Sequence, residues 1–462
     1  MDKTTALLVE YAQDFSYAAI TSPARDATLR HLVDSIACAV AGYSKEPAQI
    51  AVRVARTVSG ISPATVFGAG LTSHPAYATF ANTIMIRGLD WNDGMLAKGG
   101  GHPSDMIAAL IATAETLGSS GADLLEAIAL SYEVLGALGN GAPATQRGWD
   151  QGTFMGAATA AGIGKLRHFT GAQLANAISL SIVPSIPLMV TRRGELSMWK
   201  GAATADAVMH ALTMTQYAGE GMTGPAEPFE GTAGVFEQVT GPFELSLPAY
   251  PGGHYITEIS HQKMFPAESH SQALLGLMPT VREWTSVDEI ESIDVEAYSV
   301  MRVAIGLDPS VWDPKNRETA DHSLPYLLSV ALVDGDVTVD SFTDERIADP
   351  ALRPVMAKIS IRENEEFTAG YRPPGMEIAG SPKVRITVRT KSGGQLQEIV
   401  TYPRGHMNNP MSVADIDAKI DRTCRGVIPD EHRDAVRKAW WTIEEAPDLT
   451  EAIATIADFG DR

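Results

Sequence analysis

Four stretches of the 462-residue sequence gather side chains that can transfer protons. The first is a Gly-rich segment that carries Asp90, Asp93 and His102 and leads into a predicted helix. A carboxylate and an imidazole held close together tune each other's pKa, so these residues are a candidate acid–base set. The alternative is structural: Asn92 or Asp93 caps the preceding helix, Ser104 caps the next one, and His102 has no chemical role.

The second stretch runs from Arg192 to Gly201 and holds a lysine in an unfavourable position. If Ser197 caps the following helix, Lys200 is the third helical residue, where a cation opposes the helix dipole at a cost of ~0.3–1 kcal/mol. Local conflicts of this kind are enriched at functional sites. The alternative is a lysine whose stem lies on Trp199 while its amine stays in water.

The third and fourth stretches follow the first helical half. Lys263 to His270 falls at an inferred domain boundary, where binding clefts are favoured. Asp308 to Tyr326, which includes His322, holds more ionisable groups than a buried segment tolerates unless they are paired. A surface loop is the alternative for this fourth stretch.

Several kinds of chemistry lack their sequence patterns. Neither GxGxxG nor GxxxxGK[ST] occurs in a suitable context, so a nucleotide cofactor is unsupported. There is no HExxH, and His102-Pro103-Ser104-Asp105 lacks a GxSxG elbow. The two cysteines, Cys38 and Cys424, are too few for an iron–sulfur cluster or a Cys₄ zinc site, and they argue against a secreted disulfide scaffold. We therefore expect no metal and no cofactor, and proton chemistry on a small anionic substrate.

Composition narrows the class of protein further. Hydrophobic residues make up 45% and charged residues 20%, which excludes a disordered scaffold. The net charge of −20 and the absence of a basic run argue against a nucleic-acid partner. The sequence has no secretion signal at its start and no apolar run of about 18 residues, so neither a membrane partner nor a membrane span is expected. The predicted location is cytoplasmic.

The reactive stretches lie among segments with helical periodicity. Ser22-Pro23 predicts an N-cap followed by Pro at the first helical position, and Gly42 predicts the end of that helix. Helical stripes or small-residue faces recur at 106–117, 124–132, 152–166 and 196–218. The first half of the chain is therefore predicted to be all helical.

After about residue 265 the pattern changes to the alternation of half-buried strands. Strands are predicted at 293–298, 358–362, 383–389 and 397–402. Gly393-Gly394 predicts a hairpin between the last two. From Ser412 to Trp440 the pattern is helical again.

These patterns predict a mainly α protein with a smaller α+β domain. We expect one helical domain built from both chain ends, residues 1–264 and 405–462. The α+β domain, residues 265–404, is expected to be inserted as a lid.

Eight stretches in chain order carry a resemblance to a known family: 89–93, 101–105, 147–150, 194–201, 220–225, 263–266, 269–272 and 320–326. Each is short, but the ordered set, with the helical texture around it, resembles the MmgE/PrpD family over essentially the whole chain. This family includes 2-methylcitrate dehydratases, cis-aconitate decarboxylases and iminodisuccinate epimerase. The resemblance implies a helical domain with an α+β lid, an active site between them and, usually, a homodimer.

The resemblance also implies roles for individual residues. The predicted catalytic residues are Asp90, His102, Lys200, Lys263 and Tyr326. The predicted substrate-binding residues are Asp93, Asp150, Arg192, His270 and His322.

The activity expected from the resemblance is cofactor-independent dehydration of 2-methylcitrate or a related hydroxy tricarboxylate. His102, or Asp90 acting with it, would remove a proton α to a carboxylate, and Tyr326 would protonate the departing hydroxyl. Lys200 and Lys263 would stabilise the aci-carboxylate.

Other outcomes stay open. Decarboxylase-like members have a His where this chain has Asp150, so decarboxylation of cis-aconitate is the less expected alternative. Epimerisation of an iminodicarboxylate is another. A carboxylate-binding or structural dimer with a vestigial site is the non-enzymatic alternative.

Overall fold

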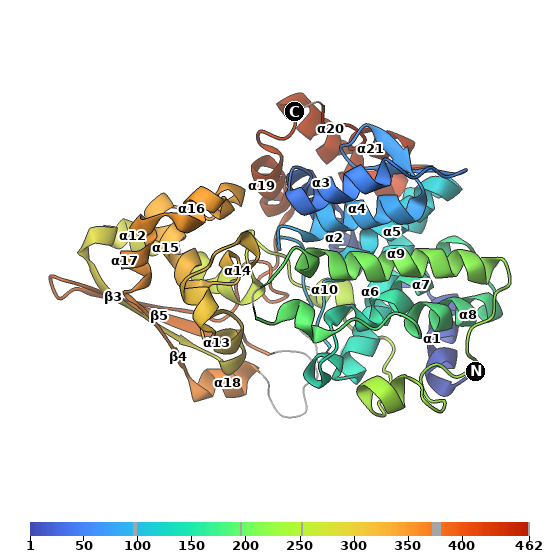
Figure 1. Ribbon diagram of the computed structural model, residues 1–462, viewed down its shortest axis with the longest axis horizontal. Helices are drawn as coiled ribbons and strands as arrows, with labels where there is room; N and C mark the ends of the chain where they lie inside the picture. The colour runs from blue at the N-terminus through green and yellow to red at the C-terminus, as the bar shows by residue number, and fades with distance from the viewer. Residues whose placement is uncertain (96–98, 195, 251–252, 372–379, 461–462) are drawn as a thin grey trace.

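The computed structural model describes residues 1–462 except 96–98, 195, 251–252, 372–379 and 461–462. Glu195, which belongs to one of the family-like stretches, lies outside the described residues. The described chain forms a larger helical part and a smaller part that contains a β-sheet, side by side (Figure 1). The predicted fold class, mainly α with a smaller α+β part, is confirmed.

The helical part begins with ten helices and a short hairpin. The helices are α1 (Lys3–Asp14), α2 (Ser22–Gly42), α3 (Glu46–Ala55), α4 (Pro75–Arg87), α5 (Ile107–Leu117), α6 (Gly121–Gly141), α7 (Met155–Leu166), α8 (Gly171–Ile182), α9 (Trp199–Gly219) and α10 (Ile256–Ile259). The hairpin pairs β1 (Ala64–Val66) with β2 (Leu71–Ser73), so the prediction of an all-helical first half is wrong at this hairpin. All four helical segments predicted between residues 106 and 218 are present.

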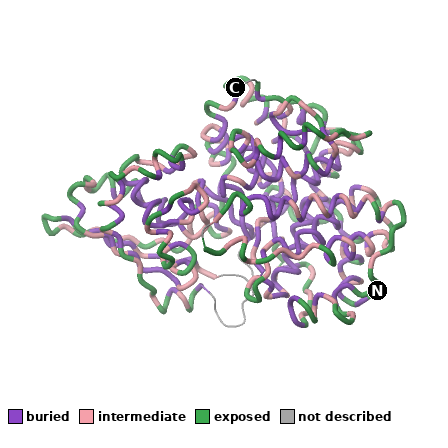
Figure 2. Tube along the Cα trace, viewed as in Figure 1, coloured by how far each residue is buried: buried purple, intermediate pink, exposed green. Residues whose placement is uncertain are grey.

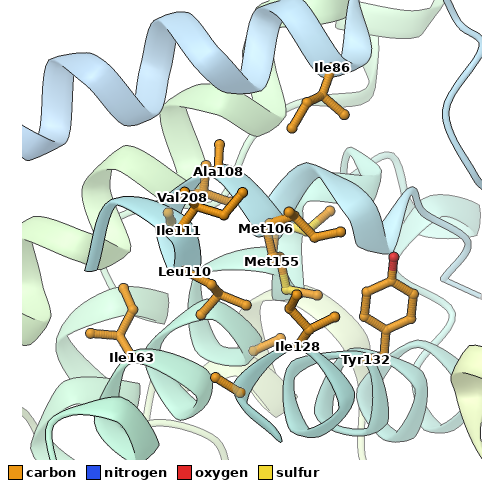
Figure 3. Close-up of a cluster of buried hydrophobic side chains, with 14 of the residues drawn as sticks. Ile86, Met106, Ala108, Leu110, Ile111, Ile128, Tyr132, Met155, Ile163 and Val208 are labelled. Atoms are coloured by element: carbon orange, nitrogen blue, oxygen red, sulfur yellow. The ribbon is translucent and has the colours of Figure 1, made fainter. Parts of the chain in front are cut away.

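Helices α4 to α9 pack around a common core of aliphatic side chains, part of which Figure 3 shows. Small residues permit close crossings there. A Cβ on Gly42, at the end of α2, would lie 2.0 Å from the carbonyl oxygen of Met85 in α4. Burial is nearly continuous along the central helices (Figure 2), so a polar side chain among them must find a partner inside the protein.

The α+β part carries a four-stranded sheet in the order β4-β3-β5-β6. Its strands are β3 (Ile290–Ala297), β4 (Ile359–Glu363), β5 (Val384–Thr390) and β6 (Gln395–Val400). β4 is parallel to β3, whereas β5 is antiparallel to both β3 and β6. The four predicted strands and the hairpin at Gly393-Gly394 are therefore confirmed to within a few residues.

Short helices surround this sheet. They are α11 (Gln272–Leu275), α12 (Met278–Trp284), α13 (Ser299–Ile305), α14 (Arg317–Ala320), α15 (Leu324–Asp334), α16 (Asp344–Ala348), α17 (Arg353–Met356) and α18 (Glu365–Tyr371). Among the described residues, the apolar side chains from Ala267 to Val388 form one hydrophobic cluster.

The C-terminal segment returns to the helical part as α19 (Val413–Cys424), α20 (Asp430–Trp441) and α21 (Thr450–Ala454). α19 and α20 contact α2, and Ile416, Ile420 and Trp440 belong to the same hydrophobic cluster as the N-terminal helices. The two hydrophobic clusters support the predicted boundaries near residues 264 and 404, which stay a prediction. No described helix is long and apolar enough to span a bilayer.

Two predicted helix caps are wrong. α2 is capped by Thr21, whose hydroxyl accepts from Ala24 N, and not by Ser22. α9 begins after Met198, which makes no side-chain cap hydrogen bond. The helix therefore starts one residue later than a Ser197 cap requires. Lys200 is therefore the second residue of α9.

Candidate active site

The segment after α4 turns sharply, and the turn brings its polar side chains close to one another. α4 ends at Arg87, and Gly88 donates its N–H to Ile84 O. Asp90 then adopts φ 52°, a left-handed conformation that is uncommon for residues other than Gly. Such backbone persists where the surroundings impose it, often at functional sites. Here it directs the Asp90 carboxylate back towards Arg87, with 3.2 Å between Oδ1 and Nη1.

Asp90 is the centre of a buried charge cluster. Lys263 Nζ donates to its Oδ1 at 2.5 Å and to its carbonyl oxygen at 2.8 Å. Lys200 Nζ lies 3.4 Å and His322 Nε2 3.7 Å from its Oδ2. Burial opposes ionisation of Asp90, but Arg87, Lys263, Lys200 and His322 together hold its pKa well below the ordinary value. A carboxylate this acidic is a weak base, so Asp90 organises the cations and does not suit proton abstraction.

Lys200 connects the two parts of the molecule. Its side chain is 3% exposed, and Nζ donates to Asp321 Oδ1 at 2.7 Å. It also lies 3.3 Å from Nδ1 of His322. The interpretation of Lys200 as a lysine with its amine in water is wrong, because Asp321, directly after α14, supplies a buried partner. The cost of a cation at the start of α9 is offset by this long-range ion pair.

The start of α9 is held by a second ion pair. Arg192 Nε donates to Asp150 Oδ2 at 2.8 Å, and its Nη1 donates to the carbonyl oxygen of Lys200 at 2.6 Å. Asp150 is fully buried and also accepts from Gly152 N. The contacts of these two predicted substrate-binding residues position the backbone that carries Lys200.

Lys263 lies where the chain passes from the helical part to the α+β part. Its side chain is 0% exposed, and among the described residues its ammonium donates to the carboxylate and the carbonyl oxygen of Asp90. The preceding His261 pairs its backbone with Gly94 in both directions. This bridge holds the Lys263 segment against the polar loop.

His102 reaches the cluster through a glycine turn. Gly100 and Gly101 have φ 61° and 145°, and Met95 N donates to Gly101 O. His102 Nδ1 lies 2.5 Å from the carbonyl oxygen of Asp93. Because a carbonyl only accepts, Nδ1 carries the proton and Nε2 keeps its lone pair.

The electrostatic surroundings keep His102 neutral. Burial, and then Arg87 and Lys263, lower the pKa of His102 well below its ordinary value, although Asp90 opposes them. A neutral imidazole with a free Nε2 lone pair is suited to accept a proton. His102 therefore has the features of the predicted base.

Asp93 is fully engaged by protein groups. Its Oδ1 accepts from Ser104 Oγ at 2.6 Å, and its Oδ2 accepts from Tyr132 OH at 2.7 Å and lies 3.1 Å from His31 Nδ1. Asn92 donates to Ser104 Oγ. Asn92 and Asp93 thus tie the loop to the next segment and do not cap α4, so the structural alternative for this stretch is wrong in its capping.

Two predicted residues point elsewhere. Tyr326 is fully buried in α15, and its hydroxyl donates to Ser341 O at 2.5 Å inside the core of the α+β part. This geometry gives no support to Tyr326 as the acid. His270 Nδ1 lies 2.5 Å from Tyr298 OH, and its ring also contacts Tyr371. Neither residue has a described contact with the Asp90 carboxylate.

One group of described side chains has the ligand types of a metal site. A carboxylate oxygen of Asp90, one of Asp321 and a ring nitrogen of His322 lie within 4.8 Å of one another. Lys200 Nζ contacts all three residues, at 2.7 to 3.4 Å, so a cation already bridges them. The prediction of a metal-free site stays a prediction.

Sequence reasoning missed Arg87 and Asp321. Arg87 is 3% exposed and follows Ile84-Met85-Ile86 at the end of an apolar helix, where a charge needs a buried partner. That pattern was a usable signal. Asp321 precedes His322 in a polar segment, and nothing local distinguishes it from its neighbours.

Models of known families match nearly the whole chain. The MmgE/PrpD N-terminal domain matches residues 6–248, and the MmgE/PrpD C-terminal domain matches residues 265–443. The second match extends through α19 and the whole of α20, which pack on the N-terminal helices.

Curated relatives align over similar lengths. The mitochondrial 2-methylcitrate dehydratase of Yarrowia lipolytica is 26% identical over 432 residues, covering 88% of this chain and 80% of that protein. The 2-methylcitrate dehydratase of Salmonella typhi is 25% identical, covering 88% and 86%. The alkylcitrate dehydratase phiI of a fungal species is 26% identical over 454 residues, covering 90% and 88%.

Proposed function

The chain belongs to the MmgE/PrpD family, and we propose that it is a hydro-lyase that dehydrates 2-methylcitrate or another alkylcitrate. The dehydratase names of its relatives support the reaction type, and 2-methylcitrate and alkylcitrate define the substrate class. The single observation that carries the proposal is the neutral His102 beside the buried cluster of Asp90, Lys200 and Lys263.

Dehydration begins with removal of a proton from the carbon next to a carboxylate. Nε2 of His102 is the proposed base, because Asp93 O holds the other ring nitrogen in its protonated form. Positioned acid–base catalysis contributes roughly 10²–10⁴-fold. The remaining acceleration must come from stabilising the negative charge that develops as the proton leaves.

Lys200 and Lys263 are proposed to stabilise that charge. Both ammonium groups are buried, where a charge interacts more strongly than in water. In the substrate-free cluster Asp90 and Asp321 neutralise them. A substrate carboxylate that replaces Asp321 on Lys200 would keep the cation paired while it approaches His102.

The hydroxyl leaves with a proton from an acid, and water is the second product. We assign the acid role to His322, because it is 23% exposed and its Nε2 faces the Asp90 carboxylate. Asp321 Oδ1, 2.6 Å from Nδ1, fixes the ring orientation. His322 thus replaces Tyr326, whose hydroxyl is bound to Ser341 O.

The two parts of the molecule complete the site together. Lys200 comes from α9, and Asp321 and His322 follow α14, so separating the two parts would open the cluster. Reclosure around the substrate would exclude water, which strengthens the electrostatic contacts. The predicted homodimer stays part of this proposal.

Product analysis by NMR tests the reaction. The protein is incubated with 2-methylcitrate, citrate, cis-aconitate and iminodisuccinate, and the products are followed in time. We expect dehydration of 2-methylcitrate, and a loss of at least about 10²-fold in His102→Ala. The control is His254→Ala, which removes a half-exposed histidine outside the cluster and should keep full activity.

Other products would redirect the proposal. Turnover of only the iminodicarboxylate would support epimerisation, and CO₂ release from cis-aconitate would support decarboxylation. Full dehydratase activity in His102→Ala would refute the role of His102. A binding protein without catalysis would bind these acids but would not speed exchange of their α-protons in D₂O.

A further inference from the structure

A cavity lies between the two parts of the molecule, next to the turn that carries Asp90. Its volume is about 470 Å³. Lys45, Trp91, Arg422 and Arg425 line it from the helical part. Asp336 and Asp340, after α15, line it from the α+β part. None of these residues takes part in the proposed dehydration.

Two of the three cations that line the cavity, Lys45 and Arg425, form no ion pair with a described residue. The third, Arg422, binds Asp336 through Nη2 at 2.8 and 3.0 Å. Burial, and then Arg317, lower the pKa of Lys45 to about 8, although Asp340 opposes them. In a chain of net charge −20, cations that are left short of carboxylates favour a small anion.

We propose that this cavity binds a small di- or trivalent anion, a phosphate or a polycarboxylate, at a site separate from the catalytic cluster. Lys45 and Arg425 supply the charge, and Arg422 supplies further donors. Because Asp336 and Asp340 come from the opposite part, the bound anion sits at the boundary between the two parts.

The site is joined to the catalytic turn through the backbone. Trp91 follows Asp90 directly, and Trp91 O accepts from Lys419 Nζ at 2.6 Å. Arg317, which lies near Lys45, donates to Leu89 O at 3.3 Å. The residues of the turn, 89–91, therefore contact the catalytic cluster on one side and border this cavity on the other.

Calorimetric titration with inorganic phosphate and with citrate tests the proposal. The parent, the double variant Lys45→Gln/Arg425→Gln, the cluster variant Lys200→Gln and the surface control Lys391→Gln are compared. We expect Lys200→Gln and Lys391→Gln to keep this anion site, and the double variant to bind at least about tenfold more weakly. Single variants at Lys45 and Arg425 serve if the double variant unfolds.

The two probes distinguish the ligand class. Binding of phosphate but not citrate to Lys200→Gln identifies a phosphate site, and binding of citrate identifies a polycarboxylate site. Unchanged affinity in the double variant overturns the proposal, and so does loss of all binding in Lys200→Gln. Because these readouts are binding and not turnover, they stand apart from the test of the dehydratase activity.

Discussion

Lys419 is fully buried and lies far along the sequence from the turn at residues 89–91, and its removal tests how that turn is held. Its Nζ lies 2.7 Å from Asp34 Oδ1 in α2 and donates to Trp91 O at 2.6 Å. Both charged side chains are 1% exposed. We predict that Lys419→Met destabilises the protein and lowers turnover, because it leaves Asp34 buried without its cation and frees the carbonyl of Trp91.

The structure sets the size of this effect. Breaking a buried ion pair from one side costs roughly 3–5 kcal/mol, because the remaining charge stays desolvated. Burial raises the pKa of Asp34 even beside Lys419. A raised folded pKa gives stability that is complete below the unfolded pKa, about 3.9, and is lost as pH rises through the folded value. Without Lys419 the folded pKa rises further, so the destabilisation should be small near pH 5 and largest near pH 8.

Urea unfolding followed by circular dichroism at pH 5 and pH 8 measures this. Lys438→Met, an exposed lysine of the neighbouring α20, is the matched control and should behave like the parent. Asp34→Asn/Lys419→Met should lose the pH dependence, because Asn cannot ionise. The reasoning is refuted if Lys419→Met unfolds like the control, or if the double variant keeps the pH dependence of Lys419→Met.

Three further predictions concern the cluster and the core. The pKa of His102 is well below 6.5, so His102 should stay neutral and kcat/KM should not fall between pH 8 and pH 6 because of its protonation. A loss of kcat/KM centred near pH 6.5 that His102→Gln removes would contradict this. Asp321→Asn should weaken the pairing of Lys200 and lower kcat/KM by roughly 10–100-fold, measured by steady-state kinetics, while a change within twofold would argue against the role. Burial raises the pKa of Glu133 to about 7, so the stability that Glu133 contributes is complete below pH 4.5 and is lost as the pH rises through 7. Glu133→Gln should make the melting temperature less dependent on pH between pH 5 and 8. An unchanged pH dependence would exclude Glu133 as its source.

Local pattern was enough to predict several elements of this fold. Helices α5, α6 and α7 and strands β3 to β6 lie where the periodicity of 3.6 or 2 places them, because each pattern depends on neighbouring residues alone. The hairpin at Gly393-Gly394 followed from turn chemistry in the same way. The caps were less certain, as Thr21 and Met198 show, since one residue more or less changes little in the pattern.

The candidate site was predictable only in part. Asp90, His102 and Lys200 stand out as polar residues in apolar or Gly-rich sequence, Lys263 lies at an inferred domain boundary, and a family resemblance joins the four. In the structure Lys200 and Lys263 each contact the carboxylate of Asp90. The charges of Asp90 and Lys263 both shift the pKa of His102. Tyr326 carries the same kind of signal, yet its hydroxyl binds Ser341 O within its own part of the molecule.

Sequence alone therefore determined several of the long helices, the strands of the larger sheet and the type of chemistry, because these depend on side-chain type and short spacing. Tertiary structure decided which charges meet. Lys200 and Asp321 are 121 residues apart, and Lys419 donates to the carbonyl oxygen of Trp91, 328 residues away. Burial makes such pairs obligatory, since an unpaired charge in the interior costs several kcal/mol. Which partner satisfies each charge is set by how the two parts pack, and no local pattern of residues contains that information.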